Sequence, residues 1–252
     1  MKNAIVIGGL SGVGKGIAKA LTGRGFNVIV GDVNANTLDK SDSLYFVDAV
    51  SSKSVNEFVS QVQQKTQHLD ALVITIGAID EGSILNIPSD KWEWIFNVNL
   101  FSSIKIVDAF LPLLEKSAKS RIMLTGSGSG FGKIDVGSGL GLYAISKHAL
   151  LGYYKVLRDE LAEKNIQVSL LIPSGIDGNL AENSAEMRQS ILKEDLSIKG
   201  SQPEGRILED TDVVGIKFVD EFLSGKGLIA NNSLQLIQKC QYELDNLIKS
   251  LL

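Results

Sequence analysis

The chain has 252 residues, 44% of them hydrophobic and 21% charged, which is enough for one large core, and we expect a single domain over residues 1–252. A net charge of −4 gives no basic surface for nucleic acid or an anionic membrane, and no apolar run reaches the roughly 20 residues that cross a bilayer. The single Cys240 excludes an internal disulfide and is typical of a cytoplasmic protein, for which we expect no secretory leader. With two histidines, we expect no metal site.

Residues 1–32 follow the order strand, glycine-rich turn, helix, strand, acid. The apolar run 4–7 is typical of a buried parallel strand. Glycines crowd residues 8–16, and apolar side chains then recur at helical spacing. A second apolar run, 28–31, ends in Asp32. This order predicts half of a nucleotide-binding fold.

The glycine-rich turn is expected to bind a diphosphate. Glycine permits positive φ and lets a phosphate approach the backbone N–H groups at the positive end of the following helix. The residues expected to make these contacts are Gly8, Leu10, Ser11, Gly12, Val13 and Gly14. Asp32 can accept hydrogen bonds from the adenosine ribose hydroxyls, and its charge would repel a 2′-phosphate, which favours NAD over NADP.

Two other interpretations of this turn stay open. Residues 9–15 fit the first seven positions of the P-loop pattern GxxxxGK[ST]. The eighth position is Gly16, so the hydroxyl that would hold Mg²⁺ is missing, which disfavours a P-loop NTPase. A glycine turn with a structural role alone is the third interpretation.

Beyond Asp32, apolar strands alternate with helical segments. The further strands are expected at residues 44–47, 71–76, 121–125, 166–172 and 228–230. The main further helices are expected at about 52–62, 88–112, 142–164, 211–223 and 234–252. The pattern predicts an α/β protein with a three-layer, doubly wound Rossmann fold, in which a parallel sheet of about seven strands has helices on both faces.

Parallel strands place their carboxyl ends along one edge of the sheet, where ligands bind in such folds. The residues at this edge that are expected to contact the cofactor, besides the glycine turn, are Asp48, Gly77, Pro173 and Ile176. The polar segment at about 179–210 is predicted to form a lid over this edge.

Tyr143 and Lys147 lie four residues apart, on one face of the helix expected at 142–164. A nearby cation stabilises a phenolate, so Lys147 would lower the Tyr143 pKa from about 10 and allow proton exchange near neutrality. Taken alone, a Tyr-x-x-x-Lys pattern is more often a solvated helix face.

In its context the pattern resembles the classical short-chain dehydrogenase/reductase family, over residues 1–176. The family's TGxxxGxG motif is similar to Ile7–Gly14, and its YxxxK motif is similar to Tyr143–Lys147. Asn99 matches the family's helix asparagine, and Ser127 best matches the serine after the fifth strand.

The resemblance implies an enzyme that transfers a hydride between NAD(H) and an alcohol or carbonyl substrate. Tyr143 would act as general acid/base, and Ser127, or alternatively Ser129, would hydrogen-bond the substrate oxygen. Lys147 would bind the nicotinamide ribose and depress the Tyr143 pKa, and Asn99 would support a water between Lys147 and solvent. The resemblance also implies a homodimer or homotetramer.

The sequence departs from the family pattern at several places. Residues 74–77 read Ile-Thr-Ile-Gly where the family has Asn-Asn-Ala-Gly, so the contacts that brace the central sheet must differ. The spacing from Ser127 to Tyr143 is a few residues longer than usual, and Gly178 replaces an expected threonine. A helix at 234–252 replaces a C-terminal glycine pair. These departures keep open a catalytically silent, dinucleotide-sensing or partner-binding protein.

Two further expectations concern the ligands. The position of Asp48 in the family implies a contact with the adenine amine, and a turn-forming role at the strand end is equally compatible with it. Ile79, Phe131 and Leu142 are expected to line the substrate pocket under the predicted lid, which favours an apolar alcohol or carbonyl substrate.

Overall fold

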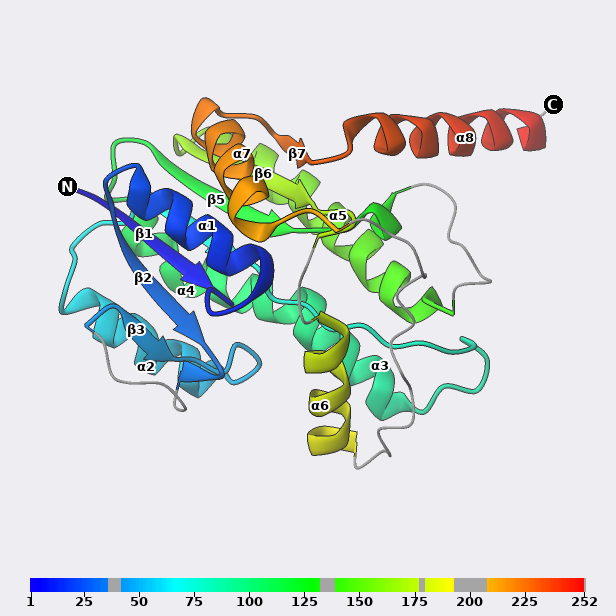
Figure 1. Cartoon of the computed structure of the whole chain (residues 1–252), viewed down its shortest axis with the longest axis horizontal. Helices are drawn as coiled ribbons and strands as arrows, with labels where there is room; N and C mark the ends of the chain where they lie inside the picture. The colour runs from blue at the N-terminus through cyan, green and yellow to red at the C-terminus, as the bar shows by residue number, and fades with distance from the viewer. Residues whose placement is uncertain (36–41, 132–138, 177–179, 193–207, 252) are drawn as a thin grey trace.

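Seven parallel strands form one sheet in the order β3-β2-β1-β4-β5-β6-β7 in the computed structural model, which describes residues 1–35, 42–131, 139–176, 180–192 and 208–251 (Figure 1). The strands are β1 (Lys2–Ile7), β2 (Phe26–Asp32), β3 (Leu44–Phe46), β4 (Ala71–Ile74), β5 (Ser120–Thr125), β6 (Ile166–Ile172) and β7 (Leu228–Ala230). The order runs outward in both directions from β1 and β4, so the sheet is doubly wound. The predicted Rossmann arrangement is confirmed.

The helices follow the strands in the predicted alternation. They are α1 (Gly12–Gly23), α2 (Ser52–Gln63), α3 (Ser89–Phe96), the π-turn η2 (Asn97–Phe101), α4 (Ser102–Leu114), the short 3₁₀ turn η3 (Gly128–Gly130), α5 (Gly141–Ala162), α6 (Leu180–Leu192), α7 (Thr211–Ser224) and α8 (Ser233–Leu251). Ser51 caps α2, because its side chain accepts a hydrogen bond from the N–H of Ser54.

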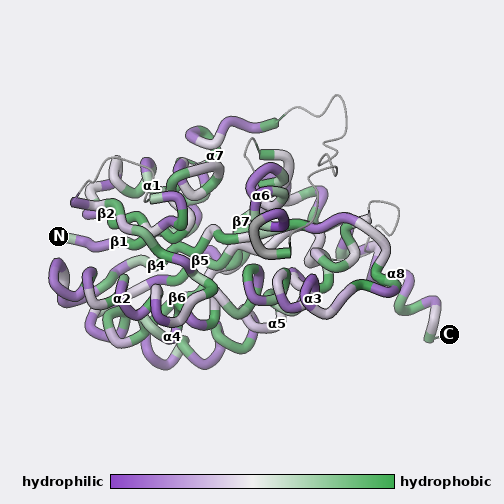
Figure 2. The backbone as a smooth tube through the Cα atoms, turned by 90° about the horizontal axis from the view of Figure 1, so that it is seen from below, coloured by the Kyte–Doolittle hydropathy of each residue, from purple (hydrophilic) through white to green (hydrophobic). Residues whose placement is uncertain are grey.

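Different helices cover the two faces of the sheet, because successive side chains of a strand point to opposite sides. Ala4 and Val6 of β1 belong to a core cluster shared with α1 and α7. Ile5 and Ile7 belong to a second cluster shared with α2, α4 and α5. Figure 2 shows the sheet between these two helical layers.

Helices α1 and α7 meet at a pair of glycines. A Cβ atom at Gly16 would lie 2.0 Å from Thr211 O, and one at Gly215 would lie 2.5 Å from Gly16 C. The two backbones are in direct contact, so the serine or threonine that a P-loop requires at position 16 has no room. The P-loop interpretation of residues 9–15 is therefore wrong.

The helix predicted at 88–112 consists of α3, η2 and α4, and it continues through Pro112. By length and composition alone, the run Ser89–Leu114 is apolar enough to cross a membrane, which the sequence analysis did not recognise. Half of its most apolar window is buried, and α4 packs against α2, β4 and β5. This run forms part of the core of the domain.

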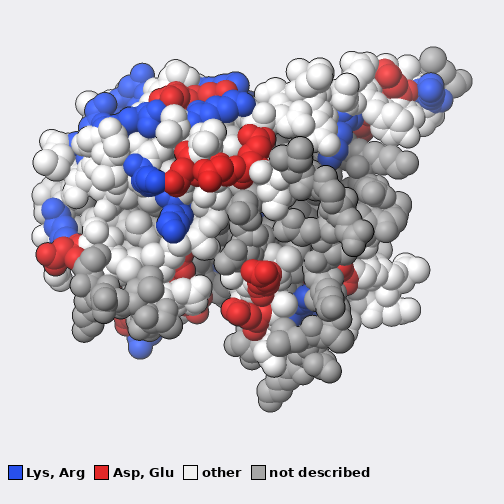
Figure 3. Space-filling view, in the orientation of Figure 1, with Lys and Arg blue, Asp and Glu red and all other residues white. Residues whose placement is uncertain are grey.

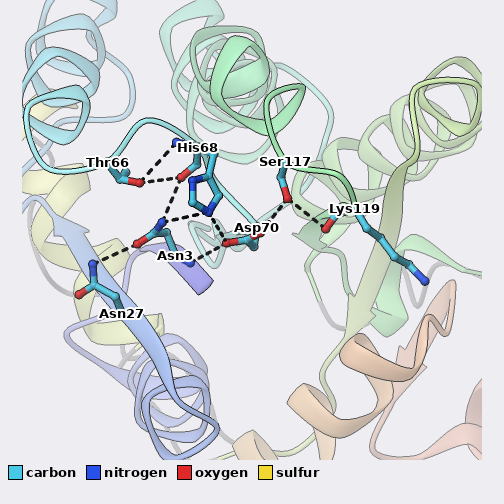
Figure 4. A network of polar contacts seen from close by, with 7 residues as sticks. All are labelled: Asn3, Asn27, Thr66, His68, Asp70, Ser117 and Lys119. Carbon is cyan, nitrogen blue, oxygen red and sulfur yellow. Dashed lines mark hydrogen bonds and ion pairs between the residues drawn. The ribbon is translucent and has the colours of Figure 1, made fainter. Parts of the chain in front are cut away.

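At the amino edge of the sheet, a polar network ties β1 to the loops that precede β4 and β5 (Figure 4). The Asp70 carboxylate accepts hydrogen bonds from Asn3 N and Ser117 Oγ, each at 2.7 Å, and lies 3.3 Å from His68 Nε2. The Asn3 side chain accepts a hydrogen bond from Asn27 on β2 at 3.2 Å. The Asp70 carboxylate is therefore satisfied by the chain itself, whereas the Ser120 hydroxyl at the start of β5 is buried without a hydrogen-bond partner among the described residues.

Candidate active site

A cleft of about 1100 Å³ opens at the carboxyl edge of the sheet. Its walls come from the loops that follow the strands, from α3 and α6, and from the first turns of α8. The predicted site residues that line it are Gly8, Ser11, Gly12, Val13, Gly14, Asp32, Asp48, Gly77, Ser127, Tyr143, Lys147, Pro173 and Ile176. Leu10 and Asn99 are absent from this lining within the described residues.

The turn after β1 leaves the start of α1 open to the cleft. Gly8 has a φ of +80°, and its N–H donates to Gly31 O at 2.8 Å, which fixes the turn against β2. Gly14 is required by packing, because a Cβ atom there would lie 2.1 Å from Gly8 O. Among the described residues, neither a side-chain cap at Ser11 nor an acid in the first turn occupies the start of α1. The N–H groups of this first turn are therefore available to an anionic diphosphate.

Asp32 is held at the end of β2 by the backbone around it. Its Oδ2 accepts a hydrogen bond from Leu10 N at 3.1 Å, and its Oδ1 accepts one from Asn34 N at 3.0 Å. The side chain is buried, and none of the described lysines and arginines forms an ion pair with it. Leu10 thus contributes to the site through its backbone, by orienting the carboxylate at the wall of the cleft.

Asp48 has the turn-forming role expected for it, and its contact with adenine stays a prediction. Its Oδ1 accepts a hydrogen bond from Val50 N at 3.0 Å, which closes a turn at the end of β3. The residue also lines the cleft beside the Asp32 wall. The turn positions the carboxylate, and the cleft exposes it to a ligand.

Threonine hydroxyls hold the ends of the central strands together at the place where the family has two asparagines. Thr75 Oγ1 lies within hydrogen-bonding distance of Ile7 O, at 2.8 Å, and of Gly8 O, at 3.1 Å. Thr125 Oγ1 donates to Ile74 O at 2.8 Å. These bonds join the ends of β1, β4 and β5 directly under the cleft. That the contacts bracing the central sheet differ from those of the family was expected from the sequence, whereas the part played by Thr75 was not.

Tyr143 and Ser127 meet at the centre of the cleft. Tyr143 lies in the first turn of α5 and lines the cleft together with Ser127, whose hydroxyl is close enough to act on the phenol. Ser127 Oγ also accepts a hydrogen bond from Ser129 N at 3.1 Å, so Ser129 supports Ser127 through its backbone. Burial raises the pKa of Tyr143, and the hydrogen bond with Ser127 offsets part of that rise.

The Lys147 ammonium lies one helical turn further along α5. It donates to Thr125 O at 2.9 Å and lies 5.7 Å from the centroid of the Tyr143 ring. The side chain is 2% exposed, and burial lowers the pKa of Lys147 to about 8. Because the ammonium faces the Thr125 carbonyl and the Tyr143 ring, it does not offset the rise that burial causes in the pKa of Tyr143. The pKa of Tyr143 is therefore raised, opposite to the direction expected from the sequence.

Asn99 lies in the short π-helix η2, behind the wall of the cleft. Its Oδ1 accepts a hydrogen bond from Ala78 N at 2.8 Å, and its Nδ2 donates to Ala78 O and to Ser146 Oγ, each at 2.9 Å. Ser146 Oγ in turn donates to Tyr143 O at 2.7 Å. The amide therefore joins the loop after β4 to the first turn of α5, which fixes the backbone of Tyr143.

Helix α6 is held over the cleft by two contacts that the sequence analysis missed. Ser184 Oγ accepts a hydrogen bond from Ile79 N at 2.9 Å. Arg188 forms an ion pair with Asp80 at 2.9 Å, with the two side chains 9% and 5% exposed. A buried ion pair of this kind fixes the orientation of the helix that carries it.

Of the three residues expected to line a substrate pocket, one lines the cleft. Ile79 lines the cleft, whereas Phe131 and Leu142 pack into core clusters. Apolar Trp94 and Met187 line the cleft, and so do acidic Glu93 and Glu186. The lining is therefore mixed, and it does not by itself favour an apolar substrate.

Some expectations fall outside the described residues. These are Gly178, residues 132–138 within the longer Ser127–Tyr143 spacing, and the parts of the predicted 179–210 lid at 179 and 193–207.

The chain is similar to known enzymes over most of its length. It matches the family model of short chain dehydrogenases over residues 2–189. It is 28% identical over 194 residues to a 3-oxoacyl-[acyl-carrier-protein] reductase of Buchnera aphidicola, covering 72% of this chain and 76% of that protein. It is 28% identical over 183 residues to a diacetyl reductase of Staphylococcus epidermidis, covering 68% of this chain and 70% of that protein.

A solved structure shares the fold. A short-chain dehydrogenase/reductase from Burkholderia phymatum, in complex with NAD, superimposes with a TM-score of 0.81 at 17% identity, covering 99% of this chain and 95% of that one. The match to the family model spans well over half of the sequence and includes the glycine turn, Tyr143 and Lys147. The chain therefore belongs to the short-chain dehydrogenase family, whose members are oxidoreductases that bind a nicotinamide dinucleotide.

Proposed function

We propose that the protein transfers a hydride between NAD(H) and an alcohol or carbonyl substrate, with Tyr143 as the general acid/base. The observation that best supports this is that Tyr143 and Ser127 both line the cleft, one helical turn from the buried Lys147 ammonium, with Ser127 close enough to act on the pKa of the phenol. Two hydroxyls that meet at one point can both contact a single carbonyl oxygen.

The roles of the two hydroxyls follow from their chemistry. A bound nicotinamide supplies the hydride that adds to the carbonyl carbon. Ser127 donates a hydrogen bond to the substrate oxygen, and Tyr143 Oη gives that oxygen its proton, so an alcohol results. Burial raises the Tyr143 pKa, so the phenol is protonated at neutral pH. A protonated phenol can supply the proton that reduction of a carbonyl requires, and the phenolate would take it back in the reverse reaction.

Lys147 and Asn99 have different roles beside the Tyr143 and Ser127 pair. Lys147 would hold the nicotinamide ribose hydroxyls with its buried ammonium, one helical turn from Tyr143. Asn99 is a positioning residue, because its amide is engaged with Ala78 and Ser146 and holds the first turn of α5. The water between Lys147 and solvent that Asn99 is expected to support stays a prediction.

The preference for NAD over NADP belongs to the same proposal. The open start of α1 and the closely packed turn at Gly8 and Gly14 suit a diphosphate. The Asp32 carboxylate, fixed by Leu10 N and Asn34 N, would accept hydrogen bonds from the ribose hydroxyls and repel a 2′-phosphate. Asp48, Gly77, Pro173 and Ile176 complete the cofactor site.

The substrate class is supported by the relatives, which reduce a 3-oxoacyl group and diacetyl. We include in the proposal a small carbonyl substrate with an apolar part against Ile79 and Met187, under a lid formed by residues 179–210. We also include a single domain, a homo-oligomer and a cytoplasmic location.

A panel of ketones, diketones and 3-oxoacyl thioesters, followed by NADH absorbance, tests the proposal. We expect the native protein to oxidise NADH with at least one of them and Tyr143→Phe to lose about 10²–10⁴-fold in kcat/KM while its NADH affinity stays near native. Tyr45→Phe, at a tyrosine outside the cleft, is the matched control.

Two outcomes would reject the proposal. Unchanged turnover in Tyr143→Phe would remove Tyr143 from the chemistry. Tight NADH binding by the native protein with no turnover across the panel would support the dinucleotide-sensing alternative instead.

A further inference from the structure

Helix α8 extends away from the body of the molecule (Figures 1 and 2). Near its start, Leu236 packs against the core and Lys239 Nζ donates to Gly128 O at 3.3 Å. Every residue from 240 to 251 is exposed. Because most of the stability of a helix in a protein comes from packing of its apolar face, an extended α8 needs a partner for that face.

The apolar residues of α8 repeat with heptad spacing. The large aliphatic side chains on this stripe and their exposed fractions are Leu234 67%, Ile237 63%, Leu244 51%, Leu247 55%, Ile248 46% and Leu251 76%. In a heptad written abcdefg, Leu234 and Ile248 occupy a positions, whereas Ile237, Leu244 and Leu251 occupy d positions. A stripe at a and d is the seam by which one helix packs against another helix with the same repeat.

The polar residues of α8 fit a helical partner. Gln241 is the one polar residue at an a position, and a single polar a residue fixes register in coiled coils. In a parallel, two-fold symmetric pair it faces the same residue of the other copy, and two amides can donate to and accept from each other.

The charges of α8 lie off the a and d stripe. They are two lysines and two acids, which leaves the helix without net charge, and Figure 3 shows α8 largely uncharged on the face in view. A helix that binds a membrane surface is instead rich in lysine and arginine on its polar face. The spacing and the charge pattern therefore favour a second helix over a lipid surface.

We propose that α8 is a dimerisation helix, which pairs in parallel with α8 of a second copy of this chain through the seam Leu234, Ile237, Gln241, Leu244, Ile248 and Leu251. This interface is isologous, because the same surface is used by both copies. The inference stands independently of the proposed hydride transfer.

Sedimentation of the full-length chain tests the pairing. We expect Leu244→Glu/Ile248→Glu to halve the mass of the native assembly and to weaken association at least 100-fold. The matched control Asn246→Glu/Ser250→Glu places the same two charges on the opposite side of α8 and should leave the mass unchanged. The melting temperature of each variant shows that the body is folded.

A second variant tests the register. Gln241→Leu removes the polar layer, so we expect the dimer to dissociate at a concentration at least tenfold lower than that of the native protein. The proposal is overturned if the native chain is monomeric at 100 µM, if the seam variant and its control have the same mass, or if Gln241→Leu leaves dissociation unchanged. Flotation of the native chain with anionic vesicles, lost in the seam variant, would assign the stripe to a membrane instead.

Discussion

At the amino edge of the sheet, the Asp70 carboxylate is engaged by Asn3, His68 and Ser117, all from the chain itself. At the carboxyl edge, the Lys147 ammonium is buried with a pKa lowered to about 8, and Tyr143 is buried with a raised pKa. The Asp70 network is closed by partners from the chain itself, whereas Lys147 and Tyr143 are desolvated at the wall of a cleft. The first group of residues braces the fold, and the second lies beside a space that a ligand could enter.

The largest effect is expected from Lys147→Met. Losing the ammonium should lower kcat/KM about 100–1000-fold, because the charge next to the proton donor is lost. The same change should raise the free energy of unfolding at pH 7 by about 1–3 kcal/mol, because a buried charge is replaced by an apolar side chain. Denaturant unfolding and steady-state kinetics measure both. Lys217→Met, at an exposed lysine, should change neither, and a loss of stability in Lys147→Met would contradict the comparison.

The pH dependence of the native protein is a second test of the buried Lys147 ammonium. Lys147 loses its charge as the pH rises through about 8, so kcat/KM for reduction should fall above that value. In the unfolded chain the lysine keeps its proton up to about 10.5, so the unfolded state binds more protons between pH 8 and 10.5. The free energy of unfolding of the native protein should therefore rise with pH across this window, relative to that of Lys147→Met. Parallel stability curves for the two proteins would be inconsistent with a buried ammonium.

The next effect is expected at the opposite edge. Asp70→Ala leaves the N–H of Asn3 and the hydroxyl of Ser117 without their acceptor, which should cost about 2–4 kcal/mol of the free energy of unfolding. Urea unfolding measures this loss, and kcat per folded molecule should stay native. Asp159→Ala removes an exposed acid paired with Arg158 and should leave the free energy of unfolding close to native. A large fall in kcat for Asp70→Ala would show that the two edges are not independent.

A smaller effect is expected from Asp32→Asn, which keeps the shape of the side chain and removes its charge. The ratio of kcat/KM for NADH to that for NADPH should fall about 10–100-fold, because the repulsion of a 2′-phosphate is lost. Kinetics with both cofactors measure the ratio. Asp48→Asn, at the neighbouring wall of the cleft, should leave the ratio close to native. An unchanged ratio in Asp32→Asn would remove the carboxylate from cofactor selection.

The same comparison explains what the sequence could predict. The glycine turn and the acid at Asp32 were predicted because their geometry depends on neighbours in the chain and on strand order. The helix face shared by Tyr143 and Lys147 was predicted for the same reason. The direction of the Tyr143 pKa was wrong, because it depends on how deeply the side chain is buried, which one helix does not reveal.

Contacts between distant segments were missed. Thr75 joins β4 to β1. Its acceptors, Ile7 O and Gly8 O, lie 68 and 67 residues away, so the sequence showed that the bracing contacts must differ but not which residue makes them. Arg188 and Asp80 are 108 residues apart, and a polar, weakly periodic segment gives no sign that one of its arginines is buried. Local patterns reveal the elements and the motif residues, whereas tertiary partners follow only from the structure.

The smallest effect is expected from Arg188→Met, which removes the ion pair that holds α6 over the cleft. We expect KM for the carbonyl substrate to rise about 3–10-fold with kcat near native, because a loosened lid weakens substrate binding more than chemistry. Gln189→Met, at the exposed next residue of α6, is the matched control. In this variant the Asp80 carboxylate keeps its ion pair with Lys91 at 3.6 Å, so no unpaired charge is left behind and the fold should stay intact. If kcat falls instead while KM stays native, α6 acts on the chemistry and not as a lid.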